Sequence, residues 1–157
     1  MVRNPDFSLK ILAPDDAPAL ANLFRSQSAS YLRGFRPFAF DETTLRTQLI
    51  QSKRDRFWGI YQRQDLIGLT MLRGFDEGYE RPSFGVMVAE TFRGRGAGQV
   101  ALAHCLDWCE ANDIRHVMLK VDKLNKTAAN LYEANGFYRI DFDHDDNEIV
   151  MQRDIQS

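Results

Sequence analysis

A glycine-rich hexapeptide at residues 93–98 separates a segment with strand composition from one with helical periodicity. It consists of Arg93, Gly94, Arg95, Gly96, Ala97 and Gly98. At a strand-to-helix turn the free N–H groups and the dipole of the helix converge on an anion, and glycines let the backbone approach it closely. The sequence therefore predicts a phosphate-binding turn, with Arg93 and Arg95 neutralising further charge at its rim.

Other uses of this hexapeptide stay open at this point. Gly96 to Ala101 also fits the dinucleotide fingerprint, with Asp122 following at the expected distance. A nucleotide P-loop fits less well, because Gln99 and Val100 stand where Lys and then Ser or Thr are required. A glycine-rich turn without a ligand is the remaining interpretation.

The order of the surrounding elements decides against a dinucleotide fold. Strand patterns precede the hexapeptide as an antiparallel meander, and a hairpin with a polar turn at 143–147 ends the chain. A parallel strand–helix–strand crossover lies between them, and its second strand, 116–122, is apolar enough to suggest burial on both faces. We expect one mixed α/β domain over residues 1–157, with strands at 7–12, 57–61, 66–73, 83–88, 116–122, 137–142 and 148–153.

Four helices are expected between these strands. The first begins after Pro14, the second is capped by Asp41, and the third runs from Gly98 to about residue 112. Asn125 is expected to cap the fourth, which Gly136 ends. The segment 28–40, between the first two helices, combines Tyr31, Arg33, Phe35 and Arg36 with further phenylalanines. This mixture suits either a pocket lining or simple anchoring to the core.

Composition excludes several classes of protein. The 157 residues are 44% hydrophobic and 27% charged with a net charge of −2, as in ordinary globular proteins. Because no run of Lys and Arg appears, nucleic acid is not an expected partner. No apolar run reaches the length of a signal peptide or a membrane span, so we expect a cytoplasmic protein that does not bind membranes.

The hexapeptide and its surroundings resemble the GNAT superfamily of acetyltransferases. That family carries Arg or Gln, two variable residues, Gly, any residue, and then Gly or Ala, and Arg93 to Gly98 match throughout. The resemblance extends to strand 84–88 and to the segment from Asn125 to Phe137, and covers about residues 57–142. It implies a GNAT-like fold and acetyl-CoA as the acyl donor.

The resemblance also implies roles for individual residues. The backbone of Val86, Met87 and Val88 would pair with the pantetheine arm, the amides of residues 93–98 would hold the pyrophosphate, and Asn125 would bind the cofactor arm. Tyr132 would protonate the departing thiolate. By its position alone, a Tyr on the apolar side of a helix is more often a core residue.

The sequence identifies the acceptor site less sharply. An alkylammonium must lose a proton before it attacks a thioester, and the acidic connection before residue 83 offers Asp76, Glu77 and Glu80. We expect Glu77 and Glu80 to act as bases and Asp76 to bind substrate together with Tyr31, Arg33 and Phe35. A solvated acidic turn is the alternative. No metal is expected, because Cys105 and Cys109 occupy the apolar face of a helix and are expected to be reduced.

The function predicted from the sequence is direct transfer of an acetyl group from acetyl-CoA to a primary amine of a small molecule. An amino sugar or an amino acid derivative is the expected acceptor class. Acetylation of protein lysines or N-termini and a non-catalytic acyl-CoA-binding module are the alternatives. The exposed strand edge of the terminal hairpin makes a homodimer a reasonable expectation.

Overall fold

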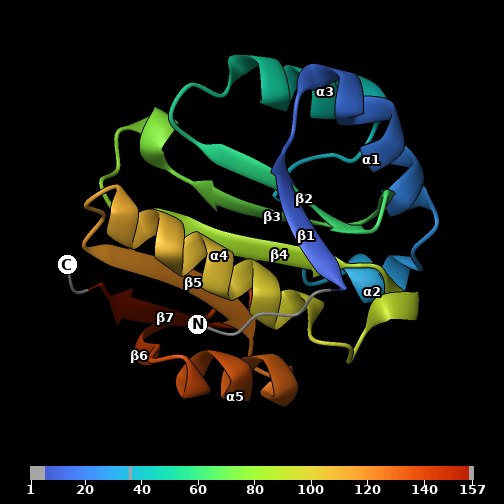
Figure 1. The fold of residues 1–157 in the computed structure, drawn as a ribbon. Helices are drawn as coiled ribbons and strands as arrows, with labels where there is room; N and C mark the ends of the chain where they lie inside the picture. The colour runs from blue at the N-terminus through green and yellow to red at the C-terminus, as the bar shows by residue number, and fades with distance from the viewer. Residues whose placement is uncertain (1–5, 36, 156–157) are drawn as a thin grey trace.

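A computed structural model describes residues 6–35 and 37–155 and contains one seven-stranded sheet, in the order β1-β2-β3-β4-β5-β7-β6 (Figure 1). Neighbouring strands are antiparallel except β4 and β5, which are parallel. The predicted meander, crossover and terminal hairpin are thus confirmed. The strands are β1 (Phe7–Ile11), β2 (Arg56–Gln62), β3 (Asp65–Arg73), β4 (Ser83–Val88), β5 (His116–Asp122), β6 (Tyr138–Asp143) and β7 (Glu148–Asp154).

The helices begin and end close to the expected residues. Asp41 and Asn125 cap their helices by accepting the backbone N–H groups of Thr44 and Ala128, and Gly136 follows the last helix with a φ of 89°. A short helix within segment 28–40 was not predicted. The α-helices are α1 (Ala17–Arg25), α2 (Ala29–Leu32), α3 (Glu42–Gln51), α4 (Ala97–Ala111) and α5 (Lys126–Ala134), and the 3-10 helices are η1 (Pro14–Asp16), η2 (Phe75–Glu77) and η3 (Glu90–Phe92).

Helices cover the two faces of the sheet unequally. Successive side chains of a strand point to opposite faces of the sheet. Trp58, Leu72 and Phe84 therefore pack in a core with α4 and α5, whereas adjacent residues on the same strands, such as Phe57 and Met71, pack in a second core with α1 and α3. Figure 1 shows α1 and α3 at the top and α5 at the bottom of the view. Strands β2 and β3 are buried on both faces along most of their length, because both layers reach them.

Strand β5 corrects an expectation from the sequence. It is not buried on both faces, because Val117, Leu119 and Val121 are buried while His116 and Lys120 are exposed. The layer formed by α1 and α3 contacts β3 and makes no extensive contact with β5. One face of the sheet is therefore left open beside β5, and the candidate acceptor cavity lies there.

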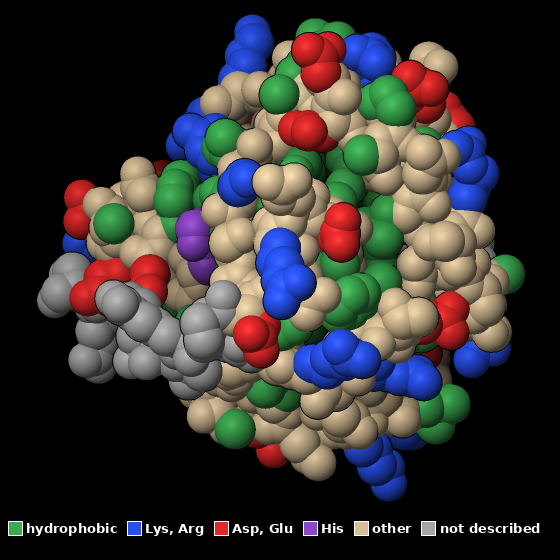
Figure 2. Space-filling view, turned by 45° about the vertical axis from the view of Figure 1, so that its right-hand side comes forward, with side chains coloured by type: hydrophobic (Ala, Val, Ile, Leu, Met, Phe, Trp, Pro, Cys, Tyr) green, Lys and Arg blue, Asp and Glu red, His purple; other side chains and the backbone are tan. Residues whose placement is uncertain are grey.

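The surface carries charges of both signs. Figure 2 shows acidic and basic side chains interspersed among hydrophobic ones on the face that it presents, without a continuous basic area. Within residues 6–35 and 37–155, no helix has the length and apolar character that a bilayer-spanning segment requires.

Candidate active site

The glycine-rich turn has the backbone conformation of an anion cradle. Gly94 and Gly96 have φ values of 79° and 89°, in the left-handed region that favours glycine. Gly96 is the N-cap of α4 without a capping side chain, and the first helical hydrogen bond runs from Val100 N–H to Gly96 O at 3.1 Å. The N–H groups at the first three positions of α4, residues 97–99, are thus left without helical partners.

Two arginines stand beside this cradle. The guanidinium of Arg93 lies 5.5 Å from the ring centroid of Tyr31, and that of Arg95 lies 5.2 Å from the ring of Phe92. Both side chains are exposed, so a ligand at the cradle can reach them. Free amides at a helix N-terminus with two adjacent guanidinium groups are a donor set suited to a diphosphate.

At the edge of β4 next to the cradle, the described structure shows backbone groups that are not paired with a neighbouring strand. Ala89 N–H bonds Ile67 O at 2.7 Å, so by antiparallel alternation the backbone groups of Phe84, Val86 and Val88 point away from β3. On that side β5 is in register with β4 only at the pair formed by Ser83 and Met118. The backbone of Val86 is therefore open to an extended ligand, whereas Met87 faces β3.

Tyr31 contacts this edge at Val88, the last residue of β4. Its hydroxyl donates a hydrogen bond to the Val88 carbonyl, which ties α2 to β4. Burial raises the pKa of the Tyr31 phenol, so it remains a donor at neutral pH. Tyr31, predicted to bind substrate, thus positions the end of β4 and is not among the residues that line the cavity.

Tyr132 lies on α5 and packs against the core that this helix shares with α4. Its ring makes edge contacts with Phe84 and Phe137, at centroid distances of 6.2 Å and 5.9 Å. Burial raises the pKa of Tyr132 to about 12. The phenol is therefore protonated throughout the physiological range and can act as a proton donor.

A pair of amides joins the helix of the cradle to the helix of Tyr132. Gln99 and Asn135 exchange two side-chain hydrogen bonds of 3.0 Å and 2.9 Å, and Asn135 also donates to Leu131 O. These contacts fix α4 relative to α5. Asn125, at the other end of α5, uses its side-chain oxygen for the cap, and within the described part of the chain its amide N–H groups have no acceptor.

A cavity of about 510 Å³ opens on the uncovered face of the sheet. Gly85 and Ser83 of β4 form part of its lining, and Phe84, at its wall, touches Tyr132. The predicted Arg33 and Phe35 line it, whereas Arg36 lies outside the described residues. The other lining residues are Gly34, Pro37, Met71, Arg73, Lys120, Asp122, Asp146 and Glu148.

Charges of opposite sign lie on the two sides of β4 in this cavity. Arg33 and Arg73 form what we call the cationic wall, on the side of α2 and β3. Asp122, Asp146 and Glu148 form the acidic wall, on the side of β5 and β7. Of these residues, sequence reasoning assigned only Arg33 to the acceptor site, because the others come from segments far apart in the sequence.

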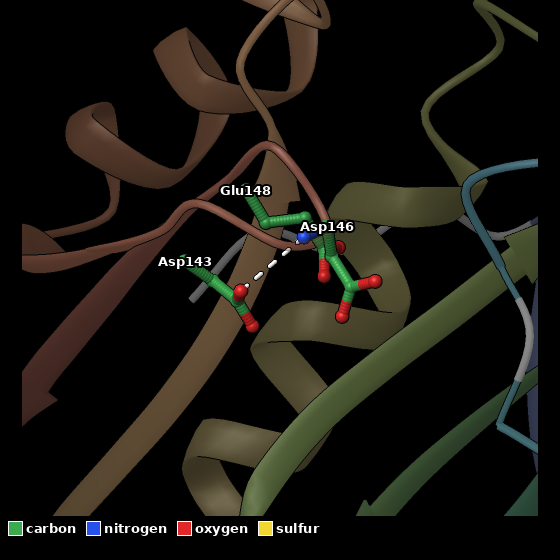
Figure 3. Close-up of side chains that lie close together, drawn as sticks. All are labelled: Asp143, Asp146 and Glu148. Atoms are coloured by element: carbon green, nitrogen blue, oxygen red, sulfur yellow. Dashed lines mark hydrogen bonds between the residues drawn. The ribbon is translucent and has the colours of Figure 1, made fainter.

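Glu148 is a partly buried carboxyl group of the acidic wall. Burial raises its pKa, and Asp146, Asp143 and Asp122 raise it further, while Lys120 opposes them. Figure 3 shows Asp146 and Glu148 close together at the β6–β7 turn. Ligand oxygens of Asp143, Asp146 and Glu148 lie within 4.8 Å of one another.

Lys120 and the turn itself balance the charge of this cluster. The Lys120 ammonium donates to Asp143 at 3.0 Å, and Asp143 also accepts the N–H groups of Asp145 and Asp146, the latter drawn in Figure 3. The same carboxylate therefore stabilises the turn and neutralises a lysine. The cluster has the contacts of the predicted hairpin turn.

The structure places the acidic residues of 76–80 away from the cavity. The Asp76 carboxylate accepts the backbone N–H groups of Lys53, Arg54 and Asp55, while the carboxylate of Asp55 accepts those of Gly74 and Asp76. Asp76 thus joins two loops and does not line the cavity. Glu77 and Glu80 are exposed and are absent from the cavity lining as well.

The cysteines have the environment of core residues. Cys105 and Cys109 are free and buried, and burial raises the pKa of each to about 12. A thiol with such a pKa is protonated at neutral pH and is a poor nucleophile. The prediction that both are reduced packing residues is confirmed.

Comparison with known proteins places this geometry in a family. A model described as the acetyltransferase (GNAT) family matches residues 20–137. A Bacillus subtilis protein described as the uncharacterized N-acetyltransferase YobR is 33% identical over 88 residues, or 56% of this chain and 35% of that protein. The chain therefore matches about a third of this relative's length.

Solved structures share the fold at low sequence identity. A ribosomal-protein-S5-alanine acetyltransferase from Vibrio fischeri has a TM-score of 0.81 at 16% identity, covering 99% of this chain and 97% of that one. A PaiA N-acetyltransferase from Thermoplasma acidophilum, solved with coenzyme A, has a TM-score of 0.76 at 16% identity, covering 94% and 98%. A spermidine N-acetyltransferase SpeG chimera from Vibrio cholerae and hSSAT has a TM-score of 0.76 at 21% identity, covering 94% and 95%.

Proposed function

Because the chain belongs to the acetyltransferase (GNAT) family, we propose that it transfers the acetyl group of acetyl-CoA to a primary amine of a small molecule. The observation that carries this proposal is the divergence of β4 from β5 beyond Ser83, which leaves the backbone of Val86 unpaired between the cradle and the cavity. Donor and acceptor can then meet at one strand edge, so that direct transfer in a ternary complex needs no covalent enzyme intermediate.

Acetyl-CoA fits the residues on the donor side of this edge. The amides of residues 97–99 and the guanidinium groups of Arg93 and Arg95 would hold the diphosphate, and the β4 backbone would pair with the pantetheine arm. Left-handed Gly94 leaves open space where a side chain would stand, which suits a close approach of the ligand to the backbone. Bound in this way, acetyl-CoA supplies an activated acetyl thioester.

The chain's own residues move the protons. Nitrogen attack forms an amide bond and breaks the C–S bond, so the amine must lose a proton and the departing sulfur must gain one. Tyr132 is suited to donate the proton to sulfur, since its phenol stays protonated at neutral pH. Glu148, whose raised pKa brings it closer to neutrality, replaces Glu77 and Glu80 as our candidate proton acceptor.

The size of the cavity supports a small acceptor. About 510 Å³ is typical of a site that encloses one small molecule. The solved structures described above include enzymes named for ribosomal-protein alanines and for spermidine, and neither acceptor follows from the shared fold. Acetylation of a protein N-terminus remains the second candidate, and a long open groove would have favoured it.

The experiment that tests this proposal is a thermal titration with acetyl-CoA and, separately, with NADH. At 100 times its Kd a ligand of the folded state adds about 2.7 kcal/mol, or roughly 5–10 °C in Tm. We expect acetyl-CoA to stabilise the protein and Gly96→Asp to abolish the effect. Gly78→Asp is the matched control, because Gly78 also has a positive φ and lies outside the cradle. Stabilisation by NADH alone would refute the proposal.

A further inference from the structure

Among the described residues, the guanidinium of Arg73 has no counterion. It lies at the end of β3, where Nη1 donates to the Pro37 carbonyl at 3.2 Å and the group stacks 5.1 Å from the ring centroid of Phe38. Its Nε is buried and finds no acceptor in the described part of the chain. Among the described residues no carboxylate forms an ion pair with it.

Such an arrangement is costly for the protein by itself. A partly buried charge loses hydration, and among the described residues one carbonyl oxygen is the single acceptor for a group with five N–H donors. An unsatisfied buried polar group of this kind calls for an explanation, such as a functional role or a bound water or ion. Because Arg73 lines the cavity, an anionic group of a molecule bound there would supply the missing acceptors.

The opposite side of the cavity has the reverse imbalance. Within residues 6–35 and 37–155, Asp122, Asp146 and Glu148 form no ion pair, since Lys120 bonds Asp143 instead. An ammonium group beside this acidic wall would be stabilised by nearby negative charge. Strand β4 separates the two walls, and its Ser83 and Gly85 occupy the lining between them.

We infer that the acceptor is a small zwitterion, an amine that also carries a carboxylate or phosphate, with its ammonium at the acidic wall and its anionic group at Arg73. This inference rests on the proposed acetyl transfer and narrows its substrate class. A polyamine would place positive charge against Arg73, and a neutral amino sugar would leave that guanidinium without an anionic partner. Apolar Phe35 and Met71 suit the uncharged part of the acceptor.

The test compares amines that differ only in the anionic group. Steady-state CoA release is measured with α-amino acids and their amides, with phosphoethanolamine and ethanolamine, and with spermidine. We expect kcat/KM for the preferred anionic amine to exceed that of its neutral partner by about 10–100-fold, the range for a hydrogen bond to a charged group. The two anionic series tell a carboxylate from a phosphate.

Variants connect this preference to Arg73. Arg73→Gln should bring the ratio of kcat/KM for the anionic amine to kcat/KM for the neutral amine close to one. Arg73→Lys should leave an intermediate ratio, because lysine keeps the positive charge but cannot form the two parallel hydrogen bonds of a guanidinium. Arg81→Gln is the matched control, since Arg81 bonds Gln152 and is absent from the cavity lining. Because Arg73 has no ion pair to lose, the Tm of Arg73→Gln should stay within a few degrees of the wild-type value.

The outcomes separate the two proposals. Turnover of neutral amines or spermidine at least as good as that of the anionic amines overturns the zwitterion proposal and leaves acetyl transfer standing. An unchanged ratio in Arg73→Gln overturns it too, as does a lack of turnover with every anionic amine when acetyl-CoA still stabilises the protein. Failure of acetyl-CoA to bind refutes the proposed function itself.

Discussion

At the scale of single residues, Tyr132 combines burial with ring contacts to Phe137 and to Phe84, a β4 residue of the cavity lining. Burial holds its pKa near 12, so ionisation cannot compete with proton donation below about pH 10. Its hydroxyl forms no hydrogen bond with another described residue, which leaves that group available to a ligand. The hydroxyl thus contributes little to folding and is suited to chemistry.

Replacing Tyr132 by Phe tests this directly. We expect kcat to fall by about 100-fold or more, the lower end for loss of a general acid, while the Kd for acetyl-CoA and the Tm change little. Stopped-assay kinetics and the thermal titration measure these quantities. A full kcat in Tyr132→Phe would show that water protonates the sulfur.

Asp76 illustrates a structural use of an acidic residue at a position that suggests chemistry. Its carboxylate binds three backbone N–H groups of the loop before β2. Asp76→Ala removes these acceptors, so we expect a loss of about 1–2 kcal/mol, or roughly 2–8 °C in Tm, with an unchanged KM for the acceptor. Glu77→Ala is the control and should leave Tm within about 1–2 °C. A raised KM in Asp76→Ala would restore it as a substrate ligand.

At the scale of elements, the start of α4 separates two glycines by their backbone conformation. Gly96 has a φ of 89°, whereas Gly98 lies in the first turn of the helix with open space around its missing Cβ. Gly96 is therefore needed for its conformation. Gly98 can become Ala without strain, in agreement with the motif, which accepts Gly or Ala there.

This contrast gives a matched pair of substitutions. Gly96→Ala should cost about 1–3 kcal/mol through left-handed strain and weaken acetyl-CoA binding. Gly98→Ala should leave the protein equally stable or up to about 1 kcal/mol more stable, with cofactor binding retained. Chemical denaturation and the acetyl-CoA titration measure both effects. Equal behaviour of the two variants would mean that the turn is not held in the described conformation.

At the scale of the whole molecule, the acidic wall is an electrostatic unit built by β5, β7 and the turn between β6 and β7. Glu148 must be ionised to attract an ammonium group, and its pKa lies above the ordinary value of 4.5 because of burial and its acidic neighbours. Below this pKa the carboxyl is neutral, so kcat/KM for the amine should rise with pH through the pKa of Glu148. Because kcat/KM reports on the free enzyme, this rising limb of the pH profile reflects the pKa of Glu148 before the substrate binds.

Two neighbours should move this limb in opposite directions. Lys120→Met removes the cation that lowers the pKa of Glu148, so the rise should shift to higher pH. Asp146→Asn removes a carboxylate that raises it, so the rise should shift to lower pH. Profiles of kcat/KM between about pH 4 and 8 measure both, and Glu148→Gln should flatten the limb. Shifts in the same direction would exclude Glu148 as the titrating group.

The sequence alone predicted most of the fold and the backbone turn that forms the candidate cradle. The strands, the caps at Asp41 and Asn125 and the glycine-rich start of α4 depend on residues a few positions apart, so their signals are local. The same holds for the cradle of Arg93 to Gly98 and for the free, buried cysteines. The family resemblance added Tyr132, whose position alone suggested a core residue.

Only the tertiary structure decided where the acceptor cavity lies and which charges it contains. Arg73, Asp122 and Glu148 come from three strands, and they share one cavity because β4 and β5 diverge and the α1–α3 layer does not cover β5. The apolar run of β5 suggested two buried faces, since a sequence does not state how far a neighbouring layer extends. The Asp76 carboxylate likewise accepts hydrogen bonds from the backbone N–H groups of Lys53 and Arg54, more than 20 positions away in the sequence. Local patterns thus determine elements, whereas contacts between distant segments determine the chemistry of the cavity.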